Sequence, residues 1–298
     1  MRNGYLIVFF WSALGLQPAF CQNNMVVFQS DFGLKDGAVS AMKGVAMGVS
    51  PDLKLFDLTH DIPVYNIWDA AYRLQQTAKY WPAGTVFVSV CDPGVGTDRK
   101  SVVMLSESGH YFVTPDNGTL TLVAEQLGIR EVRQIDEAIN RLRSSGESYT
   151  FHGRDVYAYT AARLASRTIT FAQVGPKLPN EVVRLPYQKA TFANREIRGN
   201  IPALDVQYGD VWSNIPKSMV QQLALKPGEL VRVQIFHQTK KVYDRRVPMV
   251  NTFGEAKLGA DVAYFNSLFN FSVAVNQGDF AGKYHVSSGA EWLLVVGR

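Results

Sequence analysis

The stretch MVVFQSDFGLKDGAVSAMKGVAMGV, residues 25–49, decides the fold. Its first part, Met25–Ser30, is a run of β-branched and aromatic residues, which predicts a buried strand. A polar turn with two glycines follows, and the spacing of apolar residues then predicts a helix over Asp36–Val49. A short strand followed by a helix of this length is the repeating unit of an α/β sheet with helices on its faces.

The same alternation continues to about Leu185, so we expect an N-terminal α/β domain over residues 25–187. Its further strands are predicted over Leu53–Leu58, Thr85–Val90, Ser101–Ser106, His110–Thr114 and Glu131–Ile135. Its further helices are predicted over Ile67–Tyr80, Leu120–Leu127 and Asp155–Ser166.

From about Ala190 onward the strand pattern dominates, which predicts a smaller β-rich domain over residues 190–298. The boundary is placed near residue 188, because the segment Pro186–Arg195 is polar and begins with a proline. The expected strands are Ile197–Val206, Glu229–Phe236, Lys241–Val250, Asp261–Asn266, Phe271–Val275 and Trp292–Val296.

Length and composition fit this division. The chain has 298 residues, 47% of them hydrophobic and 19% charged, which is enough for two cores and too balanced for a disordered or fibrous protein. The formal net charge is only +4, and Lys/Arg runs do not exceed pairs such as Lys240-Lys241. A nucleic-acid partner is therefore not indicated.

The first residues have the pattern of a secretory signal. Arg2 precedes a 12-residue apolar run over Tyr5–Leu16, and cleavage after Cys21 would place small residues at the two recognised positions. The run is too short for a membrane span, so a signal peptide over 1–21, export, and no stable membrane span after its removal are expected. An uncleaved anchor and a misassigned start are the alternatives. Removal leaves Cys91 as a lone thiol without an intrachain disulfide partner.

Carboxylates follow three predicted strands, where an open α/β sheet binds its ligands. The first strand is followed by Asp31–Asp36, the second by Thr59–Asp61, and the third by the glycine loop Cys91–Thr97. Neither GxxxxGK[ST] nor GxGxxG is present, and an acidic rim would repel phosphate. Carboxylates instead suit the hydroxyls of a sugar diol or a cationic ligand.

Each of these residues also has an ordinary structural interpretation. Asp36 or, with less reason, Asp31 could cap the following helix, and the glycines of the third loop could form a tight turn. His60 and Asp61 are better explained as a satisfied polar pair at a strand end than as catalytic groups. The Asp-Phe-Gly triplet at 31–33 matches a kinase motif by chance, because the other kinase motifs are missing.

His152 stands directly before a predicted helix, in Phe151–Asp155. The glycine after it would allow a ligand to approach the backbone closely, although a lone histidine is more often structural. The five histidines show no zinc-finger or HExxH spacing, so neither a metal site nor a cofactor is expected.

Six strings, taken together and in order, closely resemble the S-adenosyl-L-methionine hydroxide adenosyltransferases, which are relatives of the enzymes that form a carbon–halogen bond from the same substrate. They are Ser30–Asp36, Asp92–Arg99, Pro115–Gly118, Phe151–Asp155, Trp212–Ile215 and Ala274–Gly278. The resemblance covers nearly the whole chain after Met25. It implies an N-terminal α/β domain, a C-terminal β-barrel-like domain, and a homotrimer with sites between subunits.

The resemblance implies hydrolysis of S-adenosyl-L-methionine to adenosine and L-methionine, by attack of water at the ribose 5′ carbon. The family's triad of Asp, Arg and His falls on Asp92, Arg99 and His152. A carboxylate at 92, where halogen-forming relatives make room for halide, would repel halide and favours hydrolysis. Halide transfer is the alternative reaction, and a non-catalytic exported protein that binds a nucleoside or sulfonium compound is the alternative class.

Substrate-binding residues carry over in the same way. The resemblance places Asp31 at the ribose hydroxyls, Asp36 and Asp205 near the methionine end, and Ser267 at the methionine carboxylate. Tyr65 is expected to pack on the ribose or adenine, while Tyr208 and Phe253 are expected to flank the adenine. Without the resemblance, ordinary packing explains these three aromatic residues better.

Two positions depart from the family's pattern. Asp210 replaces an amide, so a group that both donates to and accepts from adenine becomes an acceptor only. Ser267 is followed by Leu268 where an Arg or Gly is commoner, which predicts weaker anchoring of the methionine carboxylate or anchoring from elsewhere.

Overall fold

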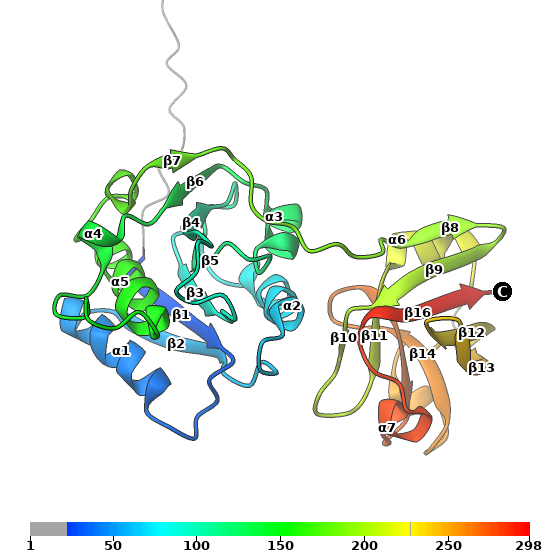
Figure 1. Cartoon of the computed structure of the whole chain (residues 1–298). Helices are drawn as coiled ribbons and strands as arrows, with labels where there is room; N and C mark the ends of the chain where they lie inside the picture. The colour runs from blue at the N-terminus through cyan, green and yellow to red at the C-terminus, as the bar shows by residue number, and fades with distance from the viewer. Residues whose placement is uncertain (1–22, 227) are drawn as a thin grey trace, which may run out of the picture.

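The computed structural model describes residues 23–226 and 228–298. The signal peptide predicted over 1–21 lies outside the described residues. The described chain forms two domains joined by residues 181–190, which have no regular secondary structure. Figure 1 shows the α/β domain and the β domain on either side of this connection, with the C-terminus in the β domain.

The N-terminal domain is built on a seven-stranded sheet of order β2-β1-β3-β5-β4-β6-β7. Strands β2, β1, β3 and β5 are parallel, and β4, β6 and β7 continue the sheet in antiparallel pairs. Their bounds are β1 Met25–Ser30, β2 Lys54–Thr59, β3 Val86–Val90, β4 Ser101–Leu105, β5 Tyr111–Pro115, β6 Glu131–Gln134 and β7 Lys177–Leu178. The parallel half brings the carboxyl ends of β1 and β3 to one edge, where the acidic loops begin.

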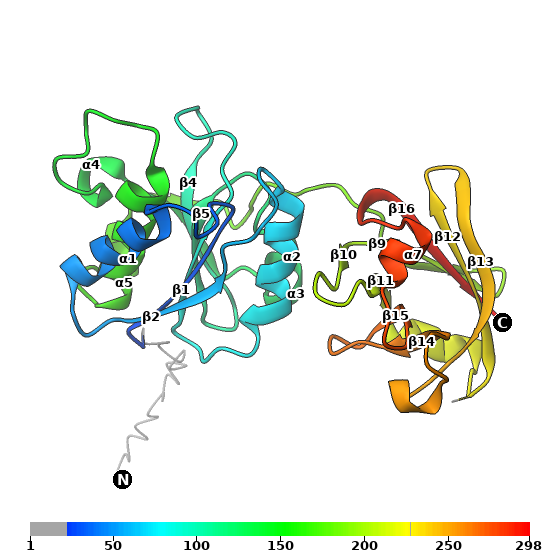
Figure 2. The same ribbon diagram turned by 90° about the horizontal axis from the view of Figure 1, so that it is seen from below.

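Helices cover both faces of this sheet (Figure 2). α1 (Ala38–Val49) and α5 (Tyr159–Ala165) pack on one face, and α2 (Ile67–Ala78) and α3 (Thr121–Leu127) pack on the other. The sheet is apolar on both sides, so β3, β4 and β5 are buried along their whole length. The short helices are α4 (Glu137–Asn140), the π-helical turn η1 (Gly153–Ala158) and the 3-10 turn η2 (Phe171–Val174).

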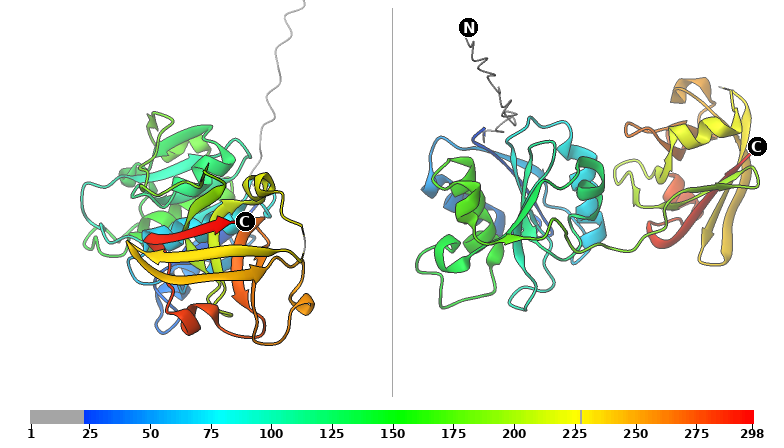
Figure 3. Two further views of the ribbon diagram at one scale, coloured as in Figure 1. Left: turned by 90° about the vertical axis from the view of Figure 1, so that its right-hand side faces the viewer. Right: turned by 90° about the horizontal axis from the view of Figure 1, so that it is seen from above.

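The C-terminal domain has two antiparallel sheets, of order β10-β11-β15-β14 and β13-β12-β16-β9-β8, around one shared core. A bridge between Met249 and Ala263 joins the sheets at one edge, and the Asn200 backbone N–H donates to Asn214 Oδ1 at 2.8 Å elsewhere. These links give the domain its barrel-like form (Figure 3). The strands are β8 Thr191–Ala193, β9 Glu196–Ile201, β10 Ala203–Leu204, β11 Val211–Pro216, β12 Leu230–His237, β13 Lys240–Pro248, β14 Asp261–Phe265, β15 Asn270–Val275 and β16 Gly289–Gly297.

Three differences from the predicted elements have physical reasons. The strand expected over 197–206 is broken at Pro202, which has no N–H to donate, and the chain changes sheets there between β9 and β10. The helix expected from Asp155 begins earlier, in the turn η1, before α5. Strand β11 was not predicted, because buried Ser213 interrupts its apolar pattern while donating a hydrogen bond to the Phe271 carbonyl at 2.6 Å.

Side chains of α2 tie the two domains together. The Trp68 indole N–H donates to the Pro202 carbonyl at 2.8 Å, and Arg73 Nη2 donates to the Leu204 carbonyl at 3.2 Å. The Tyr72 ring packs against Trp212 with ring centroids 6.4 Å apart. Across residues 23–226 and 228–298, no helix is long and apolar enough to cross a bilayer.

Candidate active site

A cavity of about 270 Å³ opens where β1 and β3 end. We call it the strand-end pocket, and four of the predicted site residues line it: Asp31, Tyr65, Asp92 and His152. They come from four separate stretches of the chain, which the strand order and the connecting loops bring to one edge of the sheet.

Arg99 holds the Asp92 carboxylate in a bidentate ion pair. Arg99 Nε lies 3.0 Å from both carboxylate oxygens, and Nη2 lies 2.6 Å from Oδ2. The two side chains are 5% and 11% exposed, so the pair is largely shielded from water. Burial is the largest influence on the Arg99 guanidinium and lowers its pKa, but the hydrogen bond to Asp92 and the nearby negative charges together outweigh burial and raise the pKa overall.

The glycine loop makes room for this pair. A Cβ on Gly94 would come within 3.3 Å of the Arg99 side chain, and Gly96 has a φ of 77°, in the left-handed region. The loop is closed by backbone hydrogen bonds from Val95 to Asp92 and from Thr97 to Gly94. The glycines therefore form the predicted tight turn, and that turn is what folds Arg99 back onto Asp92.

Two further polar groups support Asp92 and Arg99. Ser101 Oγ accepts from Arg99 Nη1 at 3.1 Å, and the Tyr157 hydroxyl lies 3.4 Å from Asp92 Oδ2. Burial raises the pKa of Tyr157, and the negative charge of Asp92 adds to the effect. The hydroxyl therefore keeps its proton and acts as a donor to the carboxylate.

His152 is 4% exposed, and one of its two ring nitrogens contacts other side chains. Its Nε2 lies 3.5 Å from Glu137 Oε2 and 3.3 Å from Arg141 Nη2, whereas its Nδ1 is buried and has no hydrogen-bond partner in the described part of the chain. The glycine after His152 packs against Phe32, because a Cβ on Gly153 would lie 3.2 Å from that ring. The glycine thus serves close packing within the chain.

Asp31 is oriented by its neighbours. The Tyr65 backbone N–H donates to Asp31 Oδ2 at 2.9 Å, and the Cys91 thiol lies 3.6 Å from the same oxygen. Burial raises the pKa of the Cys91 thiol, and the charge of Asp31 raises it further, so the thiol stays neutral. Asp31 Oδ1 has no hydrogen-bond partner among the described residues, which leaves it available to a hydroxyl.

His60 supports the loop that carries Asp31. Its Nδ1 lies 2.7 Å from Ser30 Oγ, and its Nε2 lies 3.0 Å from Asp57 Oδ1. The other carboxylate oxygen of Asp57 accepts from Lys43. The side chain is buried, so this histidine is a satisfied structural group as the sequence predicted, although its partner is Asp57 and not the adjacent aspartate.

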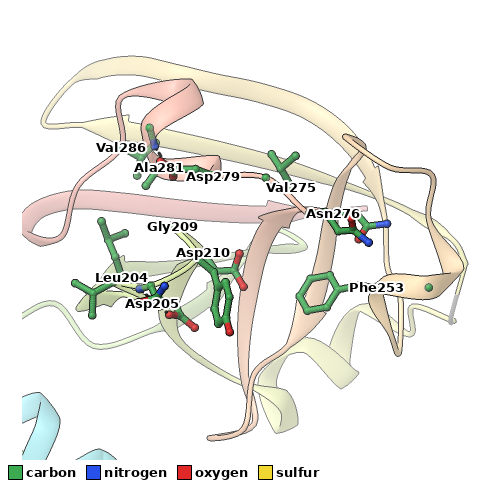
Figure 4. A pocket seen from close by; sticks show the side chains of 17 residues that line it. Leu204, Asp205, Gly209, Asp210, Phe253, Val275, Asn276, Asp279, Ala281 and Val286 are labelled. Carbon is green, nitrogen blue, oxygen red and sulfur yellow. Dashed lines mark hydrogen bonds between the residues drawn. The ribbon is translucent and has the colours of Figure 1, made fainter.

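The C-terminal domain has a larger cavity, of about 920 Å³, which we call the loop pocket (Figure 4). Four more predicted site residues line it: Asp205, Tyr208, Asp210 and Phe253. Asp279 adds a third carboxylate. No residue lines both the strand-end pocket and the loop pocket.

Asp210, in the loop pocket, has a raised pKa. Burial raises its pKa to about 6, the Tyr264 hydroxyl that donates to Oδ2 at 2.8 Å partly opposes this, and the charges of Asp205 and Asp279 add to the rise. Near neutral pH a fraction of Asp210 is therefore protonated. In that form its carboxyl group can donate as well as accept, as an amide does.

The three aromatic residues predicted to contact the nucleoside are not packed into a core. Tyr65 and Tyr208 are 68% and 67% exposed, and Phe253 is 39% exposed. Tyr65 also has a φ of 66°, which is uncommon for an aromatic residue. Exposed rings at the rims of two pockets disfavour the packing explanation and fit contact with a ligand or another copy of the chain.

Three predicted site residues line neither pocket: Arg99, Asp36 and Ser267. Arg99 is joined to the strand-end pocket through its ion pair with Asp92. Asp36 is exposed and accepts a hydrogen bond from the Ala38 backbone N–H at 2.9 Å, at the start of α1. Ser267 is exposed in the turn between β14 and β15. Sequence reasoning missed Glu137, Tyr157 and Asp279, which carried no motif of their own.

Within residues 23–226 and 228–298, no three His, Cys, Asp or Glu side chains gather as metal ligands would. The chemistry that the strand-end pocket offers is that of an oriented carboxylate beside a histidine with one unoccupied nitrogen. Such a pair can orient a water molecule and accept its proton. The loop pocket offers carboxylates for a cation and aromatic faces for a base.

Comparisons with known proteins support the same chemistry. Residues 26–175 match the family description "SAM hydroxide adenosyltransferase N-terminal domain", and residues 199–293 match the corresponding C-terminal domain. A protein of Thermus thermophilus named (R)-S-adenosyl-L-methionine hydrolase is 35% identical, over 85% of this chain and 92% of its own length. A Nocardia brasiliensis protein named fluorinase is 25% identical, over 92% and 97%.

The fold has a close counterpart among solved structures. The crystal structure of an uncharacterized conserved protein from Thermotoga maritima superimposes with a TM-score of 0.85 at 31% identity, and it covers 92% of this chain and all of that one.

Proposed function

The chain belongs to the SAM hydroxide adenosyltransferase family, and we propose that it hydrolyses S-adenosyl-L-methionine to adenosine and L-methionine. The observation that carries this proposal is the buried Asp92–Arg99 ion pair in one pocket with His152. Binding a nucleoside without turnover would need neither that pair nor a histidine with an unoccupied nitrogen.

The proposed reaction is an in-line displacement at the ribose 5′ carbon. The water oxygen forms a bond to that carbon while the carbon–sulfur bond breaks, and the sulfonium takes the electron pair and leaves as the neutral thioether of methionine. Asp92, fixed by Arg99, orients the water and stabilises the positive charge that develops on it. His152 accepts the proton that the water loses. Asp31 binds the ribose hydroxyls.

Hydrolysis is preferred to halide transfer for an electrostatic reason. A halide would have to bind beside the Asp92 carboxylate in a pocket where little water screens the repulsion. Incubating the protein with S-adenosyl-L-methionine and excess chloride or fluoride, and separating the products, tests this choice. Adenosine and methionine are expected; a 5′-halo nucleoside would replace the proposed reaction, and bound but unchanged substrate would make the protein a binder.

We further propose that the complete site forms between copies of a homotrimer. The strand-end pocket holds the catalytic groups and the loop pocket holds the carboxylates and rings suited to the methionine ammonium and the adenine. Both pockets have exposed apolar rims, at Val64 and Tyr65 in one and at Val206 and Tyr208 in the other. These rims fit a contact between neighbouring copies in a ring.

We also propose that the reaction needs no metal and no cofactor, because a sulfonium is already an excellent leaving group and gains nothing from a Lewis acid. Exhaustive chelation is expected to leave full activity, and loss of activity that one divalent ion restores would contradict this proposal.

Export of the chain remains our proposal as well, supported by the charged residue, apolar run and small residues of its first 21 positions. The substrate would then have to be released into the compartment outside. Cell fractionation of the native host with an antibody tests this proposal, and a cytoplasmic full-length chain would contradict it.

A further inference from the structure

Glu137 is a charged side chain beside the catalytic groups that neither the sequence motifs nor the proposed triad includes. It stands at the start of α4, where Asp136 caps the helix by accepting from the Ala138 N–H at 3.0 Å. Glu137 does not line the strand-end pocket itself, but its Oε2 lies 3.5 Å from Nε2 of His152, which does.

The contacts of Glu137 form a connected network. Arg141 Nη2 donates to Glu137 Oε2 at 3.1 Å, and Ser101 Oγ lies 3.5 Å from Oε1. Ser101 in turn contacts Arg99, so Glu137 is linked through two hydrogen bonds to the arginine that holds Asp92. The two members of the site that would act on water, Asp92 and His152, are thus joined behind the cavity.

The decisive observation is the unequal state of the two imidazole nitrogens. Nε2 is engaged by the Glu137–Arg141 pair, while Nδ1 is buried with no partner among the described residues. An unpartnered buried polar atom is costly unless a ligand satisfies it. His152 lines the strand-end pocket, so the water or substrate that enters this pocket is the available partner.

We propose that Glu137 is a positioning residue that accepts the Nε2 proton of His152 and so keeps the Nδ1 lone pair free for the attacking water. In this arrangement the carboxylate fixes the tautomer before the reaction and stabilises the imidazolium that forms when Nδ1 takes the proton. The inference rests on the proposed hydrolysis and assigns a role within it.

The opposite arrangement is chemically distinct. If Arg141, which lies 3.3 Å from Nε2, donated to a lone pair there, the proton would sit on Nδ1 and His152 could not accept one from water. Arg141 already donates to Glu137 Oε2 with the same nitrogen, and His152 Nε2 lies 3.5 Å from that oxygen. The pKa of Glu137 is lowered, with its hydrogen bond to His152 as the largest cause, as expected for a carboxylate acting as acceptor.

Glu137→Gln tests the proposal because the amide keeps the size of the side chain and removes its charge. We expect kcat to fall by about tenfold or more, the lower range for positioned acid–base groups, with KM nearly unchanged. Without the carboxylate the imidazolium is less stable, because the positive charge of Arg141 beside Nε2 is no longer offset. The acidic limb of the kcat profile should therefore move to lower pH.

Glu131→Gln is the matched control. Glu131 also pairs with an arginine, Arg133 at 2.6 Å, but on β6 and away from both pockets. The Glu131→Gln substitution should leave the acidic limb of the kcat profile at its wild-type pH. A limb that is unmoved in Glu137→Gln, or a change confined to KM, would reduce Glu137 to a structural role and overturn the proposal.

A nitrogen-15 NMR measurement of the His152 ring gives a readout that does not depend on turnover. The wild-type protein should show a protonated Nε2 and an unprotonated Nδ1, and Glu137→Gln should show a mixture of tautomers. A wild-type ring protonated at Nδ1 would overturn the assignment even if hydrolysis is observed. If the wild type hydrolysed nothing, the proposed function would fail on its own, and the tautomer would still be measured.

Discussion

The strand-end pocket and the loop pocket differ in how much of their geometry is fixed before a ligand arrives. In the strand-end pocket Asp92 and His152 are about one-twentieth exposed, and Asp92 has a partner on each oxygen. In the loop pocket Tyr208 is 67% exposed and Phe253 39%. Chemistry that depends on direction is thus placed on buried side chains with fixed partners, and recognition that depends on surface contact is placed on exposed loops.

This comparison predicts where substitutions act. Changes to Asp92 and His152 in the strand-end pocket should fall on kcat, because we propose that these two groups act on water. Changes in the loop pocket should fall on KM, because they alter how the substrate is held.

The largest expected effect comes from the catalytic groups. Asp92→Asn removes the charge that orients the water, and His152→Ala removes the proton acceptor. Each should lower kcat by about 10²-fold or more. Substrate affinity should change much less, since we propose that other residues make the ribose and methionine contacts. Single-turnover rates and binding constants measure both quantities, and near-normal turnover in either variant would make that residue structural.

Two matched controls separate catalysis from folding. Asp52→Asn removes an exposed carboxylate in the turn before β2 and should change nothing. His110→Ala removes another buried histidine, which contacts the Trp81 carbonyl at 2.8 Å outside both pockets. It should lower the melting temperature and leave kcat intact. Equal losses of kcat in His110→Ala and His152→Ala would mean that both act through stability.

A smaller effect is expected from the loop pocket. Tyr208→Ala removes an exposed ring that we propose flanks the adenine, and a stack between a base and an aromatic ring is worth about 1–3 kcal/mol. KM should therefore rise by about tenfold or more while kcat stays within a few-fold. Steady-state kinetics measure this, and a fall in kcat with an unchanged KM would erase the contrast between the two pockets.

The smallest expected effect is on the pH dependence of the melting temperature, through the carboxyl group of Asp210. The folded-state pKa of Asp210 is raised to about 6 from 3.8, so the folded chain binds more protons than the unfolded chain between these values. Burying the charged Asp210 carboxylate therefore lowers the free energy of unfolding by its full amount above about pH 6, and this loss disappears as the pH falls toward 4. Asp210→Asn has no charge to bury and should raise the melting temperature at pH 7.5, on the order of a few degrees, but not at pH 4. Equal shifts at both pH values would contradict the assigned cause.

The sequence predicted the N-terminal sheet better than the C-terminal domain for a physical reason. Strands β3, β4 and β5 are buried on both faces, so they are continuous apolar runs that need no context to recognise. Strand β11 carries a buried serine and an asparagine whose partners lie on other strands or on the linker, so its pattern has no clear period.

The same distinction holds for the site. Asp92 and Arg99 are seven positions apart in one loop, so their pairing could be predicted from spacing. Glu137 could not be predicted, because only the packing of α4 beside η1 brings it to His152. Separate placement of Asp92 and Asp205 in two pockets of one chain is likewise a result of the fold and has no local signal.

Complementation between two impaired variants, assayed at substrate concentrations below the wild-type KM, tests the central claim, that one active site is assembled from the strand-end pocket of one copy and the loop pocket of its neighbour. Asp92→Asn is paired with the double variant Asp205→Ala, Tyr208→Ala, each with its own affinity tag, and mixed assemblies are purified through both tags. Any trimer that contains both chains has one intact site of three, so about one third of the wild-type activity per chain should return. Activity no higher than that of the separate variants would contradict the claim and place the whole site within a single chain.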